Sequence, residues 1–252
     1  MKKSFKQKEN NNTNNKDQLI LYGRHAVISA IKNPKRRITK VVITAENRHE
    51  IDALGMPLPV SVVDRKDFNK FLPQDAVHQG FALFCARLEN YDIMDLIEMA
   101  EEKDRCHILI LDQVTDPQNI GAIIRSCAAF GTLGLVVQDK NSPLESGAMV
   151  KATAGTMEFV PVARVTNLSR AIEQLKDNGF WVMGMDGYAD VTIDKVNKDG
   201  KIAIVMGSEG KGMRRLVQEN CDTSVKLKIS ENVESLNVST AAAIALYELS
   251  KD

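Results

Sequence analysis

The sequence predicts an α/β protein in which a parallel sheet, covered by helices on both faces, follows a smaller α/β domain. From residue 106 onward, continuous apolar runs rich in β-branched residues alternate with amphipathic segments. Strands that are buried on both faces of a parallel sheet show this pattern. Nearer the N-terminus, three shorter strand-like runs precede an acidic stretch at 89–105. The change of pattern at that stretch predicts two domains.

The N-terminal elements are predicted in chain order. Residues 1–17 are polar and rich in asparagine, which predicts a disordered tail. A small α/β domain then follows over 18–88, with a short helix over 21–33 that Pro34 ends and strands over 40–44, 60–64 and 81–87. Residues 89–105 place Ile93, Leu96, Ile97 and Ala100 on one helical face, which predicts a linker helix.

The second domain, 106–252, is predicted to alternate strands and helices. Its strands are expected at 107–113, 134–139, 159–165, 180–186, 201–207 and 224–229. Its helices are expected over 119–131, 143–155, 168–179, 213–221 and 236–249, with Gly131 at the end of the first.

Composition narrows the class of protein. The four cysteines and four histidines are scattered without metal-ligand spacing, so the sequence predicts reduced thiols and no metal site. No apolar run reaches the roughly 18 residues of a membrane span, and no apolar segment follows the N-terminal lysines. These features predict a cytoplasmic protein that does not enter a membrane.

The charge distribution indicates a polyanionic partner. Net charge is zero, but residues 1–40 carry 11 Lys or Arg against 2 Asp or Glu, so this part has a charge of +9 and the rest −9. Arg24, Lys32, Lys35, Arg36 and Arg37 are the candidate phosphate contacts of the small domain, although for each residue alone an exposed surface charge is the favoured interpretation.

Three polar clusters follow predicted strands, where open α/β sheets bind ligands. The first is DQVTDPQNIGAIIRS, with Asn119 as a possible helix N-cap and Arg125 in an apolar helix, where a buried charge would need a partner. The second is GSEGKGM. Its Glu209 would repel a phosphate, and the phosphate-loop and dinucleotide fingerprints are absent. The third contains Ser235, Asn237 and Ser239 before an alanine-rich helix, and capping explains only one of the three.

These clusters carry a resemblance to a known family. N-x-G-x-x-x-R, G-S-E-G-x-G and S-L-N-V-S-x-A-x-x-I, in this order between 112 and 248, resemble the three motifs of the SpoU family of RNA ribose 2′-O-methyltransferases, which are SPOUT enzymes. LYGRHAV and VHQGFAL resemble the small, L30e-like substrate-binding domain of the subfamily that methylates a guanosine in large-subunit (23S) ribosomal RNA. The resemblance implies a C-terminal trefoil knot, S-adenosylmethionine as cofactor, ribosomal RNA as substrate and a homodimer joined through the catalytic domain.

The resemblance also implies roles for single residues. The expected catalytic residues are Asn119, Arg125, Glu209, Ser235 and Asn237. The expected cofactor-binding residues are Gly207, Ser208, Gly210, Leu227, Ile229, Leu236 and Asn237. Glycines at 207, 210 and 212 are expected to let the backbone approach the cofactor. The family assigns Arg125 the part of general base; a guanidinium stays protonated in proteins, so positioning of a phosphate and stabilisation of a developing alkoxide is the alternative.

Three other functions remain open at this point. The same chemistry on transfer RNA is one, although the small domain argues against it. A non-catalytic RNA-binding assembly factor is the second, and the intact motifs argue against that. A nucleotide-dependent enzyme with an ordinary doubly wound sheet is the third, and the missing fingerprints oppose it.

Overall fold

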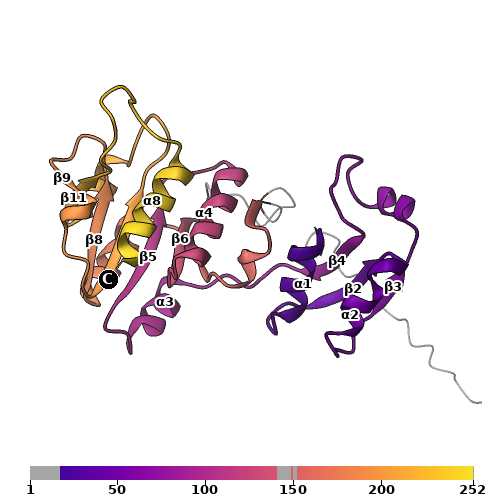
Figure 1. Cartoon of the computed structure of the whole chain (residues 1–252). Coiled ribbons are helices and arrows are strands. Elements are labelled where there is room, and N and C mark those ends of the chain that lie inside the picture. Colours follow the sequence, from indigo (N-terminus) through magenta and orange to yellow (C-terminus); the bar gives the residue numbers. More distant parts are fainter. Residues whose placement is uncertain (1–17, 141–148, 150–151, 252) are drawn as a thin grey trace, which may run out of the picture.

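The N-terminal part of the molecule is a small four-stranded α/β domain. The computed structural model describes residues 18–140, 149 and 152–251, and Figure 1 shows its two sheets in separate parts of the molecule. The first sheet has the order β1-β4-β2-β3, with only the β2–β3 pair parallel. Its strands are β1 (Gln18–Tyr22), β2 (Ile38–Ile43), β3 (Val60–Val62) and β4 (Phe81–Ala86). Its helices are α1 (Arg24–Lys32) and α2 (Arg48–Asp52), with 3-10 turns η1 (Ala45–Asn47) and η2 (Arg65–Lys70).

The start of this domain differs from the prediction. The segment expected to begin a helix at residue 21 begins instead with the end of strand β1, which pairs antiparallel with β4 over its whole length. Gly23, with φ of 90°, makes the turn from β1 into α1. A five-residue strand offers too little periodicity to separate it from a helix start, so only the tertiary pairing distinguishes the two.

The predicted linker helix over 89–105 is shorter and belongs to a layer of the second domain. Helix α3 covers only Ile93–Ala100, and Asp92 begins it with a capping box to Asp95. Its apolar face packs into the core under the large sheet. Apart from one isolated bridge at Tyr91, residues 87–92 have no regular secondary structure and form the covalent link between the domains.

The large sheet has seven strands, and every neighbouring pair is parallel. The spatial order is β7-β6-β5-β10-β8-β11-β9. The strands are β5 (Cys106–Leu111), β6 (Gly134–Gln138), β7 (Val162–Val165), β8 (Phe180–Met185), β9 (Val191–Thr192), β10 (Lys201–Met206) and β11 (Thr223–Lys226). The parallel sheet predicted from the apolar runs is confirmed.

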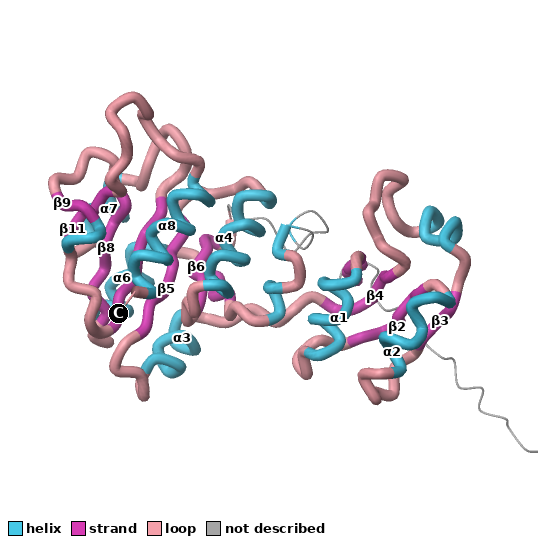
Figure 2. Tube along the Cα trace, viewed as in Figure 1, coloured by secondary structure: helices cyan, strands magenta, loops and turns pink. Residues whose placement is uncertain are grey.

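Helices cover both faces of this sheet (Figure 2). One core holds the inner faces of α4 (Pro117–Ala129) and α8 (Val238–Ser250), and the other holds those of α3, α6 (Leu168–Asp177) and α7 (Arg215–Asn220). Alternate residues of β5 enter opposite cores, Leu109 and Leu111 on the α4 side and Ile108 and Ile110 on the α3 side, as the two-residue period of a strand requires. Short turns η3 (Thr156–Glu158) and η4 (Ile193–Lys195) complete the described elements.

The order of strands creates a switch point between β5 and β10. From β5 the chain moves outward to β6 and β7, and β10 later enters on the other side of β5. Loops after two such strands diverge and leave a crevice at their carboxyl ends. Helix α4 begins two residues earlier than expected, because Asp116 rather than Asn119 accepts hydrogen bonds from the first backbone N–H groups. Most of the helix expected over 143–155, like the tail at 1–17, lies outside the described residues.

Within the described parts of the chain, every helix is too short or too polar to cross a membrane.

Candidate active site

A buried ion pair holds together the two loops at the switch point. Asp112, at the end of β5, has no solvent exposure, and its carboxylate accepts hydrogen bonds from the backbone N–H and the Nε of Arg214 at 2.7 and 2.8 Å. Arg214 lies just before α7, after the glycine loop that follows β10. The next residue, Gln113, has a φ of 60°, a left-handed conformation that costs a side-chain-bearing residue free energy. Asp112 therefore fixes the position of the end of the glycine loop. The sequence patterns did not assign this role to it.

Three of the predicted catalytic residues meet at this crevice. Asn237 Nδ2 donates to Glu209 Oε1 at 2.7 Å and to Asn119 Oδ1 at 3.0 Å. Glu209 Oε1 also accepts from the backbone N–H of Val238 at 3.1 Å and, more weakly, from Asn119 Nδ2 at 3.5 Å. The cluster joins α4, the glycine loop and the start of α8, which are 90 and 28 residues apart along the chain. Among the described residues, Glu209 Oε2 has no hydrogen-bond partner, so this oxygen can bind a ligand.

Asn237 also begins α8. Its Oδ1 accepts from the backbone N–H of Ser239 at 2.9 Å and from Ser239 Oγ at 2.5 Å. One side chain thus caps the helix with its oxygen and orients Glu209 with its amide nitrogen, which explains why Asn is suited to this position better than the other capping residues.

The glycines of GSEGKGM serve the shape of the loop itself. A Cβ on Gly207 would lie 2.2–2.5 Å from backbone atoms of Gly212 and Met213. Gly210 and Gly212 have φ of 77° and 66°, and a Cβ on either would meet no atom within 4 Å. Ser208 closes the loop through backbone hydrogen bonds in both directions with Gly212. The loop therefore needs more than one glycine, because it folds back on its own backbone.

Arg125 and Ser235 stand apart from the cluster. Both are exposed, and neither makes a hydrogen bond or ion pair with Asn119, Glu209 or Asn237. The expectation that Arg125 is buried in its apolar helix and needs a partner is wrong: Ile123, Ile124 and Cys127 face the core, while Arg125 faces away from it. The guanidinium is therefore available to a group outside this chain.

The segment over 227–236 has the properties expected of a pocket for S-adenosylmethionine. Among the described residues, the only backbone–backbone hydrogen bond of this segment joins the N–H of Val233 to the carbonyl of Ser230. Ile229 and Val233 are 39% and 45% exposed, and Leu227 packs partly on the core. Unpaired peptide groups can read the edge of an adenine, and exposed apolar side chains can cover its faces. The residues present, including half-buried Leu236 and Ser208 of the glycine loop, therefore fit the cofactor that the resemblance implies.

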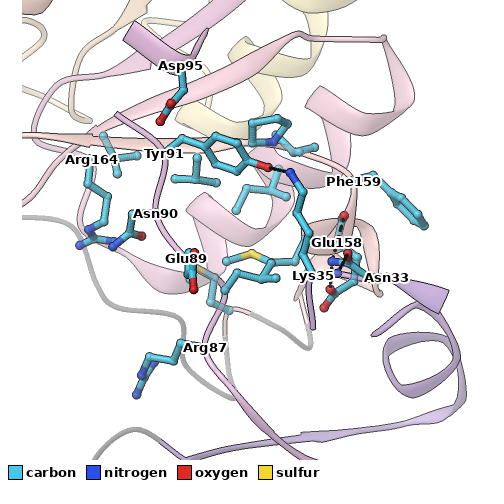
Figure 3. A pocket seen from close by; sticks show the side chains of 18 of the residues that line it. Asn33, Lys35, Arg87, Glu89, Asn90, Tyr91, Asp95, Glu158, Phe159 and Arg164 are labelled. Atoms are coloured by element: carbon cyan, nitrogen blue, oxygen red, sulfur yellow. Dashed lines mark hydrogen bonds between the residues drawn. The ribbon is translucent and has the colours of Figure 1, made fainter. Parts of the chain in front are cut away.

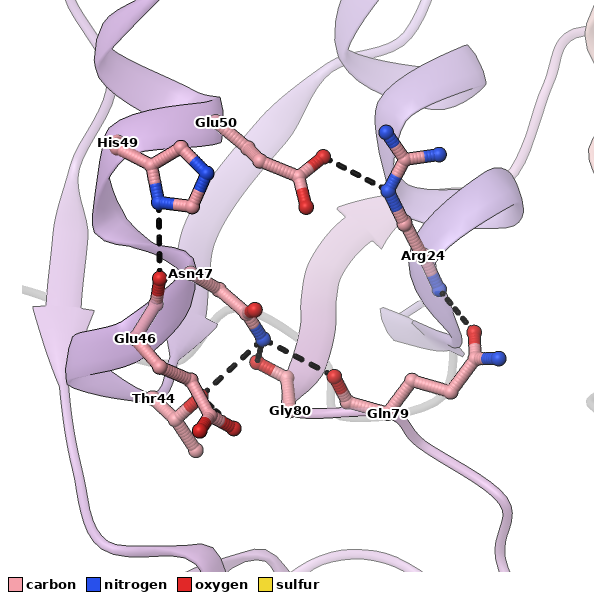
Figure 4. Close-up of polar contacts among 8 residues, drawn as sticks. All are labelled: Arg24, Thr44, Glu46, Asn47, His49, Glu50, Gln79 and Gly80. Carbon is pink, nitrogen blue, oxygen red and sulfur yellow. Dashed lines mark hydrogen bonds and ion pairs between the residues drawn. The ribbon is translucent and has the colours of Figure 1, made fainter.

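The motif VHQG forms a rigid corner of the small domain (Figure 4). Gln79 has a φ of 53°, and its Oε1 accepts the backbone N–H of Arg24 at the start of α1. Asn47 Nδ2 donates to the carbonyl of Gln79 at 3.0 Å, and a Cβ on Gly80 would lie 2.5 Å from that nitrogen. The two N-terminal sequences of the resemblance, LYGRHAV and VHQGFAL, therefore pack against each other.

The five predicted phosphate contacts differ in their surroundings. Lys32 is exposed, Arg24 pairs with Glu50 at 2.7 Å, and Arg37 forms a highly exposed pair with Glu89. Lys35 Nζ donates to the hydroxyl of Tyr91 at 2.5 Å, and this bond raises the pKa of the lysine.

Arg36 must be removed from the set of RNA contacts. Its side chain has no exposure and pairs with Glu158 of the second domain at 2.5 Å. A cavity of about 890 Å³ beside this pair is lined by both domains, including Lys35, Tyr91 and Phe159 (Figure 3). The cavity lies between the domains and apart from the glycine loop, whose residues do not line it.

Fold and site together define a two-domain α/β protein whose functional centre lies at the switch point of a parallel sheet. Residues 107–247 match the SpoU rRNA Methylase family, and residues 20–91 match the family described as RNA 2′-O ribose methyltransferase substrate binding. The chain belongs to the SpoU rRNA methylase family and is an RNA 2′-O-methyltransferase with a substrate-binding domain of its own. The resemblance seen in the sequence is confirmed.

Similar proteins extend over nearly the whole chain. The 23S rRNA (guanosine-2′-O-)-methyltransferase RlmB of Pseudomonas aeruginosa is 35% identical over 237 residues, which are 91% of this chain and 94% of that protein. An uncharacterized tRNA/rRNA methyltransferase of Synechocystis is 37% identical over 238 residues, but this chain spans only 62% of its length.

Solved structures show the same fold. The SpoU methyltransferase AviRb from Streptomyces viridochromogenes, in complex with AdoMet, superposes with a TM-score of 0.78 at 17% identity and covers 93% of this chain and 90% of its own. An AdoMet-bound rRNA methyltransferase from Sinorhizobium meliloti also gives a TM-score of 0.78, at 20% identity, over 93% and 87% of the two chains.

Proposed function

We propose that this protein transfers a methyl group from S-adenosylmethionine to the ribose 2′-hydroxyl of a guanosine in large-subunit (23S) ribosomal RNA, a reaction of the cytoplasm. The observation that carries the proposal is the cluster of Asn119, Glu209 and Asn237, which leaves one carboxylate oxygen open beside the exposed peptide groups of 227–236. The RlmB relatives of Pseudomonas aeruginosa and Coxiella burnetii, both 35% identical, support guanosine in 23S RNA as the substrate.

The residues of the cluster can orient the attacking hydroxyl. The bound cofactor would supply an electrophilic methyl group on a sulfonium, which the 2′-oxygen must approach in line with the carbon–sulfur bond. Glu209 Oε2 can accept a hydrogen bond from the 2′-hydroxyl, while Asn119 and Asn237 hold Oε1 and so fix the carboxylate. Such fixed orientation can contribute on the order of 7–11 kcal/mol to a reaction in the best intramolecular cases.

Arg125 is the proposed electrostatic partner of the RNA. A guanidinium can donate two parallel hydrogen bonds to a phosphate and can stabilise the negative charge that develops on the 2′-oxygen as its proton leaves. Because Arg125 is exposed and separate from the cluster of its own chain, it is suited to a site completed by a second copy.

A homodimer through α4 and α8 fits this arrangement. Ile244 and Tyr247 on α8 are 38% and 50% exposed, and the Tyr247 ring contacts Phe130 at the end of α4 with the ring centres 5.7 Å apart. An exposed apolar face on two adjacent helices is typical of a subunit interface. The replacement Ile244→Glu is therefore expected to shift the protein from dimer to monomer in sedimentation-velocity analysis.

The trefoil knot stays a prediction. It is supported by the course of the chain: β10 enters between β5 and β8, and the segment over 227–236 returns from β11 to place α8 against α4.

A methyl-transfer assay tests the proposed function. Labelled S-adenosylmethionine is incubated with large-subunit ribosomal RNA that lacks its natural modifications, and the labelled ribose is mapped. Wild type should label one guanosine 2′-oxygen, and Arg125→Ala should lose the label. Arg170→Ala, which changes an exposed arginine of α6 on the other face of the sheet, should retain it. Label in transfer RNA alone would overturn the substrate, and absence of label in both RNAs would favour an RNA-binding assembly factor.

A further inference from the structure

The covalent link between the two domains does not by itself fix their orientation. Residues 87–92 contain no helix and only an isolated bridge, so the backbone there can rotate about several dihedral angles. A substrate-binding domain that presents one ribose to a distant catalytic centre must nevertheless be held at a defined position. The contacts between the domains show what can hold it.

Among the residues that the structure describes, one carboxylate of the catalytic domain accepts hydrogen bonds from two side chains of the small domain. Glu158 Oε1 pairs with Arg36 at 2.5 Å, and its Oε2 accepts from Arg36 Nε at 3.2 Å and from Asn33 Nδ2 at 2.7 Å. Arg36 also donates to the carbonyl of Ala86 at the end of β4. The Arg36 and Glu158 side chains are 0% and 2% exposed. Figure 3 shows Asn33 and Glu158 directed at each other. We name these three residues, Asn33, Arg36 and Glu158, the interdomain clamp.

The backbone beside the clamp is closely packed. Gly155, with φ of 89°, precedes the turn that carries Glu158. A Cβ on Gly155 would lie 2.7 Å from Ser29 Oγ and 2.9 Å from the carbonyl oxygen of His25, both on α1. Helix α1 therefore rests directly on the catalytic domain, and a glycine is needed for the approach.

The clamp is connected to the helix that carries Asn119. Met157, next to Glu158, lies in the same core cluster as Ile120 and Ile124 of α4. On the same helix, a Cβ on Gly121 would lie 2.4 Å from the Cβ of Ala152. Close packing of this kind transmits position, since interiors have few voids into which a side chain can move.

We propose that Glu158 is a positioning residue: through Arg36 and Asn33 it fixes the substrate-binding domain against α4 and so sets which ribose reaches the cluster of Asn119, Glu209 and Asn237. The functional part of this inference rests on the proposed methyl transfer, but the clamp itself does not. Because Arg36 and Glu158 are shielded from water, loss of either charge leaves the other charge buried without this ion pair, and the contact between the domains becomes less favourable.

The chain offers a matched control. Arg37 and Glu89 also join the small domain to the link, but their side chains are 78% and 83% exposed. Exposed ion pairs of this kind contribute little to the free energy of folding. Glu158→Gln thus changes a buried pair between the domains, and Glu89→Gln makes the same chemical change at an exposed pair between the small domain and the link.

Distances between the domains test the clamp without any assay of activity. Spin labels are attached at Lys66→Cys and Glu173→Cys, both exposed, in a Cys221→Ser background, and labelled protein is diluted with unlabelled protein so that only pairs within a chain are measured. Wild type and Glu89→Gln should give one narrow distance distribution by pulsed electron resonance. Glu158→Gln should give a broad one. An unchanged, narrow distribution in Glu158→Gln would overturn the inference.

Kinetics on the ribosomal RNA substrate test the functional part. A misplacement of about 1 Å can slow an oriented reaction about 100-fold, so the single-turnover rate of Glu158→Gln should fall about 10- to 100-fold. The Kd for RNA should change less than about threefold, because the exposed basic residues remain. Arg36→Met added to Glu158→Gln should reduce the rate little further, since the two act as one unit.

The outcomes separate the inference from the proposed function. If wild type neither transfers methyl nor binds S-adenosylhomocysteine, the proposed function fails, and the distance distributions still decide whether the clamp exists. If wild type is active and Glu158→Gln matches Glu89→Gln in rate, the positioning role of Glu158 is overturned.

Discussion

Asp112 and Glu158 are buried carboxylates that bind arginines from a different part of the chain. Asp112 opens the first polar cluster but had no role assigned to it from sequence, and Glu158 lies outside all three clusters. Asp112 has 0% exposure and holds Arg214, while Glu158 holds Arg36. A buried charge is tolerated only when it is paired and hydrogen-bonded. Each ion pair therefore fixes two parts of the chain relative to each other. Asp112 and Arg214 fix the glycine loop, and Glu158 and Arg36 fix the two domains.

Replacement of Asp112 should loosen the glycine loop. Asp112→Asn keeps the shape of the side chain but removes the charge that binds Arg214 in two places. Hydrogen bonds to charged groups contribute about 1.5–3 kcal/mol, and Arg214 is 37% exposed, so the free energy of unfolding should fall by about 1–2 kcal/mol. Urea denaturation measures this change, and affinity for S-adenosylhomocysteine should fall with it. Glu219→Gln, which breaks the exposed pair with Arg215, is the control and should change neither quantity.

Cys221 should resist alkylation at neutral pH. Burial, with a further contribution from the charge of Asp222, raises the pKa of this thiol to about 11. A raised pKa keeps the unreactive thiol form as pH rises, so at pH 8 only about 0.1% is thiolate. Site-resolved mass spectrometry after iodoacetamide treatment should show slow labelling at pH 8 that accelerates up to about pH 11. Asp222→Asn should lower the pKa and speed labelling at pH 9; an equal rate in both proteins would contradict the assigned cause.

Sequence alone predicted the residues of the site better than their surroundings. Asn119, Glu209 and Asn237 stand in ordered motifs after strands, and the structure brings them within hydrogen-bonding distance. The apolar residues on both sides of Arg125 in the sequence suggested that it is buried. Helix α4 packs on one side only, and the sequence pattern did not show that Arg125 lies on the other side. Burial of Arg36 depends on the contact between domains, which no local pattern encodes.

At the level of elements, the loop after β10 needs glycine at two positions for two different reasons. Gly207 has no room for a Cβ because backbone atoms lie 2.2–2.5 Å away, whereas Gly210 has room but a φ of 77°. The first restriction is steric and the second conformational, so substitutions should separate them.

Gly207→Ala should therefore harm the loop more than Gly210→Ala. The first must displace the backbone of Gly212 and Met213, and overpacking of this kind costs about 1–3 kcal/mol. The second forces a left-handed alanine, which costs about 1–2 kcal/mol, and leaves the backbone path intact. Isothermal titration with S-adenosylhomocysteine should show a loss of about tenfold or more for Gly207→Ala, the equivalent of 1.4 kcal/mol, and a smaller loss for Gly210→Ala. The reverse order would contradict the steric reading of Gly207.

Long apolar elements were predicted well and short or half-exposed ones less so. Strands β5 and β10 have five apolar residues among six each and lie where the sequence placed them. Strand β1 and helix α3 differed from prediction because they have only five and eight residues, which are too few to show a clear hydrophobic period. Their identity depends on partners far along the chain, β4 for β1 and the sheet for α3.

At the scale of the whole molecule, the proposed dimer makes a prediction about where each site obtains its arginine. In a dimer with C2 symmetry, α4 of each copy can face the cluster of the other copy. Arg125 of one chain would then complete the active site that contains Asn237 of the other chain. Arg125→Ala and Asn237→Ala should each be inactive alone. When the two are unfolded together and refolded as a mixture, half the dimers contain one copy of each, and in such a dimer one of the two sites has both residues.

Methyl transfer by the refolded mixture should therefore recover to about a quarter of the wild-type rate, the statistical share for a two-fold dimer. Each variant refolded alone is the control and should remain inactive, and thermal melting should show that both variants fold. If Arg125 instead served the site of its own chain, every mixed dimer would carry one site without the arginine and one without the asparagine, and no activity would return. Recovery thus distinguishes a site built from two copies from a site complete in one, which the exposure of Arg125 leads us to favour.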